Sequence, residues 1–198
     1  MRIIDARGLA CPGPVLEAKA SLGKGPTDTI KVIVDNEAAQ HNVSRFLVHH
    51  GFEAKTHREG NDFHVIGSFK KGFSAVPAEE PEKKPGLKKI MVMVATDRMG
   101  FGDDELGLKL MANFIKTLNE IGPELWRLIF VNNGVKLTIK NSEVLPSLKA
   151  YEKNGLQILV CGTCLTHFKL LDEKQVGETT NMLDIVTAMQ VADKVINI

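Results

Sequence analysis

The 198-residue chain contains only three cysteines, one tryptophan and one tyrosine, and its formal net charge is +1. Three cysteines cannot form a scaffold of paired disulfides, because one thiol is left over and a chain of this length can build its core without them. We therefore interpret the cysteines as reactive groups in a reducing compartment. The low charge and the isolated aromatics argue against direct nucleic-acid binding through a basic surface or a stacking platform.

Long hydrophobic runs are also missing. The longest uninterrupted apolar run, from Ile90 to Ala95, has six residues, whereas a membrane-spanning helix needs roughly 20. Asp5 places a charge where a secretory signal peptide would have its apolar core. We expect a cytoplasmic protein with no membrane partner.

The composition predicts a globular chain with two domains. Hydrophobic residues make up 43% of the sequence and charged residues 25%, which is typical of globular proteins. Three of the eight prolines lie among charged residues in the segment 76–88, which cannot bury enough apolar surface to fold by itself. We expect an N-terminal domain over residues 1–75, a flexible linker over 76–88 and a C-terminal domain over 89–198.

The N-terminal pattern predicts two helices packed on one small sheet, a two-layer α/β sandwich of order βαβαββ. Apolar residues alternate in the strand segments and recur at helical spacing between them. The expected strands are residues 3–5, 30–34, 52–58 and 63–70, and the expected helices follow Pro14 and precede Gly51.

The C-terminal pattern predicts a parallel sheet with helices on both faces, because fully apolar strands alternate with helical segments. Strands are expected at 90–96, 125–131, 156–161 and 194–198, and helices at 106–118, 145–153 and 182–191. In the first helix we expect one apolar side made of Leu106, Leu110, Phe114 and Leu118. Ligands of such sheets bind beyond the carboxyl ends of the strands, which here are followed by residues 97–103, 132–135 and 161–164.

Cys11 directly precedes Pro12-Gly13-Pro14, and both prolines suit the first turn of a helix. A thiol at or near the N-cap would be favoured as a thiolate by the helix dipole and by free N–H groups, which we expect from Gly13 and Val15. Arg7 could add positive charge. An exposed thiolate without a neighbouring base suits the carriage of a group, but an ordinary small buried cysteine is the alternative.

Residues 5–15, DARGLACPGPV, resemble the signature of the TusA/SirA-like sulfur-carrier family. The resemblance extends over nearly all of residues 1–72, with one departure at Lys19-Ala20, where many members have paired lysines. It implies the βαβαββ sandwich and a persulfide on Cys11, with Arg7, Pro12, Gly13 and Pro14 as supporting residues. It also implies a cysteine desulfurase or another sulfur donor as partner.

Cys161-Gly162-Thr163-Cys164 is a C-x-x-C motif at the end of a predicted strand, and we expect a helix after it, near Leu165–Leu171. Two such thiols can form a disulfide, share a persulfide or bind a metal. Zinc is disfavoured because only His167 lies close in sequence as a further ligand. Two small buried residues are the remaining alternative.

Three segments of the C-terminal half, residues 101–107, 132–137 and 161–165, resemble the DsrE-like half of the YedF group. The group joins a TusA-like domain to a DsrE-like domain and is associated with sulfur or selenium metabolism. The resemblance implies a flavodoxin-like sheet, a supporting role for Asn132, Asn133 and Gly134, persulfide acceptance, and homo-oligomers formed through the DsrE-like domain.

The leading hypothesis is a relay protein that resembles a sulfurtransferase. Cys11 would receive sulfur or selenium and pass it to Cys161 or Cys164, and a downstream protein would accept it. The alternatives are a dithiol redox protein that uses Cys161 and Cys164, and a non-catalytic regulatory module that binds another protein. We expect no cofactor and no metal, and interpret His49, His50, His57 and His64 as solvated side chains.

Overall fold

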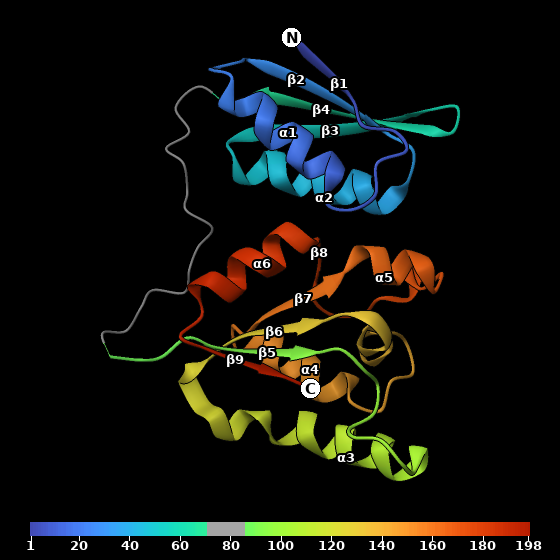
Figure 1. Cartoon of the computed structure of the whole chain (residues 1–198), viewed down its shortest axis with the longest axis vertical. Helices are drawn as coiled ribbons and strands as arrows, with labels where there is room; N and C mark the ends of the chain where they lie inside the picture. Colours follow the sequence, from blue (N-terminus) through green and yellow to red (C-terminus); the bar gives the residue numbers. More distant parts are fainter. Residues whose placement is uncertain (71–85) are drawn as a thin grey trace. The chain divides into compact units, whose positions relative to one another are not determined.

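The computed structural model describes residues 1–70 and 86–198, and the chain divides into an N-terminal and a C-terminal compact unit (Figure 1). Most of the expected linker, residues 76–88, lies outside the described residues, so its boundaries stay a prediction.

The N-terminal unit has the expected order βαβαββ. Its elements are β1 (Arg2–Asp5), α1 (Gly13–Gly23), β2 (Thr29–Val34), α2 (Glu37–His49), β3 (Phe52–Glu59) and β4 (Asp62–Phe69). The strands form one sheet in the order β1-β2-β4-β3, in which only β1 and β2 are parallel. Both helices lie on the same face of this sheet (Figure 1), which confirms the two-layer sandwich.

Alternation along β2 decides which face meets the helices. Ile30, Val32 and Val34 are fully buried, whereas the residues between them are partly exposed. The buried residues form one core with Val15 and Ala18 of α1 and with apolar residues of α2. The opposite face of the sheet therefore carries the alternate side chains of every strand, including those of two histidines in the hairpin β3–β4.

The C-terminal unit is a parallel sheet in the order β8-β7-β6-β5-β9. Its strands are β5 (Ile90–Val94), β6 (Leu125–Phe130), β7 (Gln157–Cys161), β8 (Glu178–Thr180) and β9 (Lys194–Asn197). Its α-helices are α3 (Asp104–Thr117), α4 (Leu145–Lys153), α5 (Gly162–His167) and α6 (Met182–Val191), with 3₁₀ segments η1 (Leu118–Glu124), η2 (Asn132–Thr138) and η3 (Leu171–Glu173).

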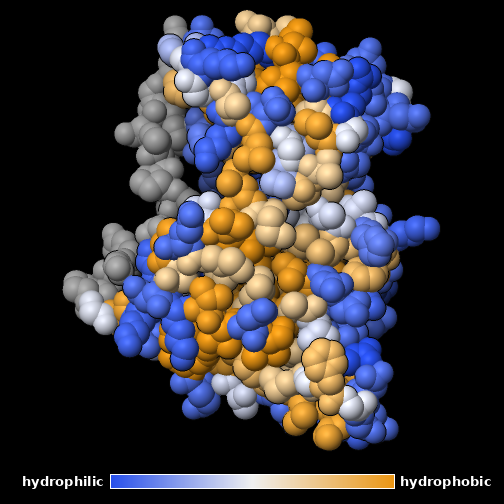
Figure 2. Space-filling view, viewed as in Figure 1, coloured by the Kyte–Doolittle hydropathy of each residue, from blue (hydrophilic) through white to orange (hydrophobic). Residues whose placement is uncertain are grey.

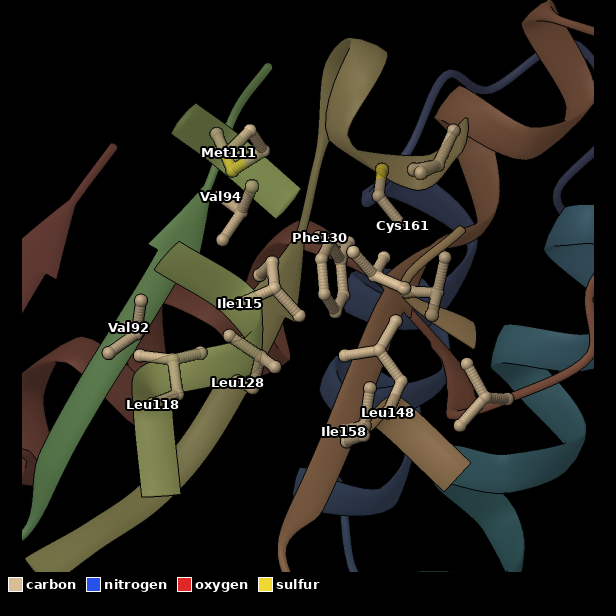
Figure 3. Packing of buried hydrophobic residues seen from close by; sticks show 14 of the residues in the cluster. Val92, Val94, Met111, Ile115, Leu118, Leu128, Phe130, Leu148, Ile158 and Cys161 are labelled. Atoms are coloured by element: carbon tan, nitrogen blue, oxygen red, sulfur yellow. The ribbon is translucent and has the colours of Figure 1, made fainter. Parts of the chain in front are cut away.

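Separate apolar clusters cover the two faces of this sheet, as expected for a flavodoxin-like fold. One contains Phe130 together with residues of α3 and α4, and the other contains Ile129 together with residues of α6. In Figure 3 the Phe130 ring lies between Ile115 of α3 and Leu148 of α4. The predicted fold class of this half is confirmed.

The predicted apolar side of α3 is wrong at its first two residues, Leu106 and Leu110, whereas Leu118 is buried and Phe114 packs against the core. Leu106 is 54% exposed and Leu110 is 42% exposed, whereas Gly107, Met111 and Ile115 are buried. The helix carries two adjacent apolar stripes, and the periodicity of the sequence cannot choose between them. Gly107 decides the choice, because it allows the chain to approach Arg98 and Met99 closely. Figure 2 shows apolar side chains at the surface of the C-terminal unit, in orange.

Two further differences concern short elements. The strand β8 was not predicted, because its three residues, Glu-Thr-Thr, lack an apolar pattern. The helix α5 begins at Gly162, directly after the end of β7, rather than near Leu165. The second cysteine of the C-x-x-C motif therefore lies inside a helix.

The backbone of Gly134 lies close to the end of β5. A Cβ atom at this position would lie 2.2 Å from the carbonyl oxygen of Val94. We predict that Gly134→Ala lowers the free energy of unfolding by about 2–3 kcal/mol, since backbone cannot move aside cheaply. Chemical denaturation of the full-length chain measures this.

Gly23→Ala is the matched control, because no heavy atom lies within 4 Å of a Cβ there and the residue ends α1. This control is expected to be neutral or to stabilise by about 0.5–1 kcal/mol. Equal stability of the Gly134→Ala variant and the wild type would contradict the close approach.

Candidate functional sites

Cys11 lies in the loop between β1 and α1, directly before Pro12, the N-cap of α1, and it is partly buried. The position at the start of the helix is as predicted. The two N–H groups expected to face the thiol, however, are used elsewhere. Gly13 N donates to Ala10 O over 2.7 Å and Val15 N donates to Pro12 O over 3.0 Å.

Carboxylates hold the Cys11 loop at two adjacent residues, Arg7 and Gly8. Arg7 pairs through Nη2 with Asp5 Oδ2 at 2.6 Å and through Nη1 with Asp62 Oδ2 at 2.9 Å. Gly8 N donates to Asp35 Oδ2 over 2.6 Å. Arg7 thus pairs with two carboxylates and connects the loop to the hairpin β3–β4. Its positive charge is engaged in these ion pairs and is not directed at Cys11 as predicted.

The same contacts change the acidity of the carboxyl groups. Hydrogen bonds from the Arg7 side chain, followed by that from its backbone N–H, lower the pKa of Asp5 to about 2. The hydrogen bond from Gly8 N lowers the pKa of Asp35. Both carboxylates are therefore charged at neutral pH, and they hold the loop at two adjacent residues, Arg7 and Gly8.

Gly13 and Pro14 shape the turn after Cys11. Pro14 is buried in the first turn of α1, a position that tolerates the missing N–H. A Cβ atom at position 13 would lie 3.0 Å from Leu9 Cβ, so glycine lets the loop pack against the start of the helix. This arrangement leaves Cys11 partly exposed at the end of a fixed loop.

The second cysteine site lies at the carboxyl edge of the parallel sheet. Cys161 ends β7, is 5% exposed and forms the N-cap of α5. It lies at the border of the cluster around Phe130 (Figure 3). Cys164 is the third residue of α5 and is partly exposed.

Two hydrogen bonds converge on Cys164. The Cys161 thiol donates to Cys164 Sγ, and Asn132 N donates to the same sulfur over 3.1 Å. The bond from Cys161 is the main reason that the pKa of Cys164 is lowered from 9.0 to about 6, against the opposing effect of partial burial. Cys164 is consequently mostly a thiolate at neutral pH, which makes it the more nucleophilic of the two.

The loop after β6 brings Asn132 to the sulfur. Asn132 adopts a left-handed conformation with φ of 48°, which asparagine tolerates better than most residues. Gly134 N donates to Val131 O over 2.9 Å and closes the turn. Two of the three predicted loops thus meet at Cys164. Among the described residues no hydrogen bond connects residues 97–103 or Asn133 with Cys164 Sγ.

The two halves of the chain match two known families. Residues 2–67 match the family described as Sulfurtransferase TusA, and residues 88–198, more than half of the chain, match the DsrE/DsrF-like family. The chain belongs to the DsrE/DsrF-like family and carries a TusA domain before its DsrE-like domain. The two domains support a role in a sulfur relay.

Solved structures resemble each domain. A SirA-like protein from Desulfitobacterium hafniense is 27% identical, with a TM-score of 0.32, and the match covers 34% of this chain and 96% of that protein. The YchN protein from E. coli is 15% identical, with a TM-score of 0.45, over 57% of this chain and 100% of YchN. A protein of unknown function from Methanobacterium thermoautotrophicum is 14% identical, with a TM-score of 0.42, and the match covers 55% of this chain and 97% of that protein. No curated protein matches the chain.

Two further properties follow from the described residues. No helix in 1–70 or 86–198 is long and apolar enough to cross a membrane.

In the TusA domain His64 is only 7% exposed, so its interpretation as a solvated side chain is wrong. It lies beside His57 and Glu59, a grouping of three residues that sequence reasoning missed. The signal available was the predicted pairing of their two strands.

The acidity of Cys164 generates one prediction for the DsrE-like domain. Alkylation of Cys164 by iodoacetamide should rise with pH around a midpoint of about 6. In Cys161→Ala the midpoint should move up by at least about one pH unit, because the donated hydrogen bond is lost. Peptide-resolved mass spectrometry separates this reaction from alkylation of the other two thiols.

Cys161→Ser is the conservative control, since a hydroxyl can still donate to the sulfur. It should keep the midpoint closer to the wild-type value than Cys161→Ala does. A midpoint that is the same in wild type and Cys161→Ala would contradict the assigned hydrogen bond.

The Arg7 clamp generates a second prediction, for the TusA domain. In Arg7→Gln the pKa of Asp5 should rise from about 2 toward its ordinary value of 3.8, since the guanidinium that favours the carboxylate is removed. NMR titration of the Asp5 carboxyl carbon measures this. Arg58→Gln removes another arginine of the same domain, one that stacks on Phe63, and should leave Asp5 unchanged. Equal shifts in both variants would argue for a general charge effect instead.

Proposed function

We propose that the protein relays sulfane sulfur from a donor protein through Cys11 to Cys164 of its own or a neighbouring DsrE-like domain. The observation that carries this proposal is the activated state of Cys164, which accepts hydrogen bonds from Cys161 and from Asn132 N. The match of the first domain to Sulfurtransferase TusA supports Cys11 as the earlier carrier.

The first step is an exchange between a thiolate and a persulfide. The Cys11 thiolate attacks the outer sulfur of a donor persulfide, such as that of a cysteine desulfurase. A new S–S bond forms on Cys11, the S–S bond of the donor breaks, and the donor leaves as a thiolate. The proton stays on the transferred sulfur, and no external oxidant or reductant is consumed.

The second step repeats this chemistry inside the protein. The Cys164 thiolate attacks the outer sulfur carried by Cys11, and Cys11 leaves as a thiolate. Cys164 is the better acceptor of the two C-terminal cysteines because it is partly exposed and acidic, whereas Cys161 is buried. Covalent attachment of the two domains raises the effective concentration of each site for the other.

A dithiol reaction is the second candidate, favoured by the contact between Cys161 and Cys164. Cys161, once deprotonated, would attack Sγ of the Cys164 persulfide, and the bond from Sγ to the outer sulfur would break. Hydrosulfide would leave and a Cys161–Cys164 disulfide would remain, so a cellular thiol reductant would be needed to restore the pair. This reaction releases sulfur instead of passing it on.

The proposal extends to partners and cargo. A downstream protein would take the sulfur from Cys164, and selenium could follow the same route because the same thiolates would carry it, as the YedF-like arrangement of domains suggests. We expect the protein to act in the cytoplasm, where thiols stay reduced.

The relay predicts an order of loading. After incubation of the full-length protein with a cysteine desulfurase and cysteine, wild type should carry one extra sulfur atom on Cys11 and on Cys164. Cys11→Ser should carry none on either site, because Cys164 depends on Cys11. Cys164→Ser should carry sulfur on Cys11 alone. Mass spectrometry of non-reduced peptides locates the added atom.

Each alternative leaves a different result. Equal loading of Cys164 in wild type and Cys11→Ser would overturn the relay, as would the absence of added sulfur on Cys11 of the wild type. Release of hydrosulfide with a Cys161–Cys164 disulfide, both abolished by Cys161→Ser, would establish the dithiol reaction. A regulatory module would keep its cellular effect after substitution of all three cysteines.

A further inference from the structure

The hairpin β3–β4 of the TusA domain brings two imidazoles and one carboxylate together. His57 and Glu59 lie two residues apart on β3, so both side chains are on the same face. His64 is the direct partner of His57 on β4. This is the face opposite the helices, because Phe63 and Val65, the neighbours of His64, pack into the helix-covered core.

His64 is the fixed member of the group. It is 7% exposed, and its partner on the other side is Ile33 of β2, so the ring is held between two strands. His57 lies against it edge-on, with ring centroids 5.1 Å apart. The orientation of the buried ring is therefore set by strand pairing before any ligand binds.

The buried nitrogen of His64 points to a missing partner. His64 Nδ1 lies 3.0 Å from Glu59 Oε2, but the contact does not have hydrogen-bond geometry, and Nδ1 has no hydrogen-bond partner among the described residues. A buried polar atom without a partner is costly. A cation between the ring nitrogen and the carboxylate would satisfy both groups.

The neighbouring charges do not compete for this position. Asp62, the cross-strand partner of Glu59, is engaged by Arg7 at 2.9 Å. Lys55, two residues before His57, lies 3.7 Å from Glu53. Glu59 thus offers a carboxylate, with an exposed side chain at 72%, that is free to turn toward an ion.

We propose that His57, Glu59 and His64 bind a divalent transition-metal ion of the zinc type. One ligand atom from each residue already lies within 4.8 Å of the others, whereas ligands around tetrahedral zinc, at about 2.0–2.2 Å from the metal, are roughly 3.5 Å apart. Rotation of the exposed His57 and Glu59 side chains closes this gap around the fixed His64.

The donor set selects the class of metal. Imidazole nitrogen suits zinc, copper, nickel and iron, whereas magnesium and calcium prefer oxygen ligands only. Two neutral histidines and one carboxylate leave a net positive charge on bound zinc. With three protein ligands, one coordination position stays open for water or for another ligand. This site is independent of the three cysteines and of the proposed relay.

The test uses the full-length chain without an affinity tag and with all three cysteines changed to serine, so that thiols cannot bind the metal. Titration with zinc chloride, monitored by calorimetry, should show that one zinc ion binds per chain. Glu59→Gln and His57→Gln, both at exposed positions, should weaken binding by at least about 10-fold. NMR signals of the His57 and His64 rings should broaden when cobalt(II) replaces zinc.

The matched control lies on α2, where His41 and Glu37 form an exposed pair at 3.9 Å. His41→Gln should leave zinc affinity unchanged. The proposal is overturned if the serine variant binds no zinc, if Glu59→Gln and His57→Gln bind as tightly as their parent, or if His41→Gln weakens binding equally. Circular dichroism of each variant separates loss of a ligand from loss of the fold.

Discussion

The close approach of the loop after β6 to the end of β5 is the constraint on which the C-terminal site depends. Only glycine fits at position 134, where a Cβ atom would collide with the carbonyl oxygen of Val94. The turn closed by Gly134 places Asn132 N at 3.1 Å from Cys164 Sγ. Asn132 N therefore adds a fixed backbone donor to the larger stabilisation of the thiolate by the Cys161 hydrogen bond, and this donor needs no reorganisation when the thiolate forms.

The two cysteine sites use different physical means. Cys164 is activated by direct hydrogen bonds, one from a buried thiol and one from a backbone N–H. Cys11 instead lies on a loop that is fixed by the ion pairs of Arg7 and by the hydrogen bond from Gly8 N to Asp35. In the TusA domain the charged side chains thus hold the loop, whereas in the DsrE-like domain the polar groups donate hydrogen bonds to the sulfur itself. An exposed thiol is accessible to other molecules, whereas a lowered pKa keeps a thiol in its nucleophilic thiolate form.

Sequence reasoning succeeded where one local pattern had one structural solution. The alternation of Ile30, Val32 and Val34 and the prolines after Cys11 predicted the strand and the helix correctly. It failed where two solutions were equally good locally. The helix α3 has two apolar stripes, and the packing of Gly107 against the preceding loop chose the one that includes Met111 and Ile115.

The sequence by itself determined the two domain types and the fold class of each, and it predicted the cysteines as the reactive residues, because periodicity and short motifs are local properties of the chain. Tertiary structure alone decided which groups surround each residue. It directed Arg7 to Asp5 and Asp62, brought Asn132 N to Cys164, and placed His57, Glu59 and His64 in one group. Most of these contacts depend on strand register and on close backbone packing, which local patterns of the sequence do not specify.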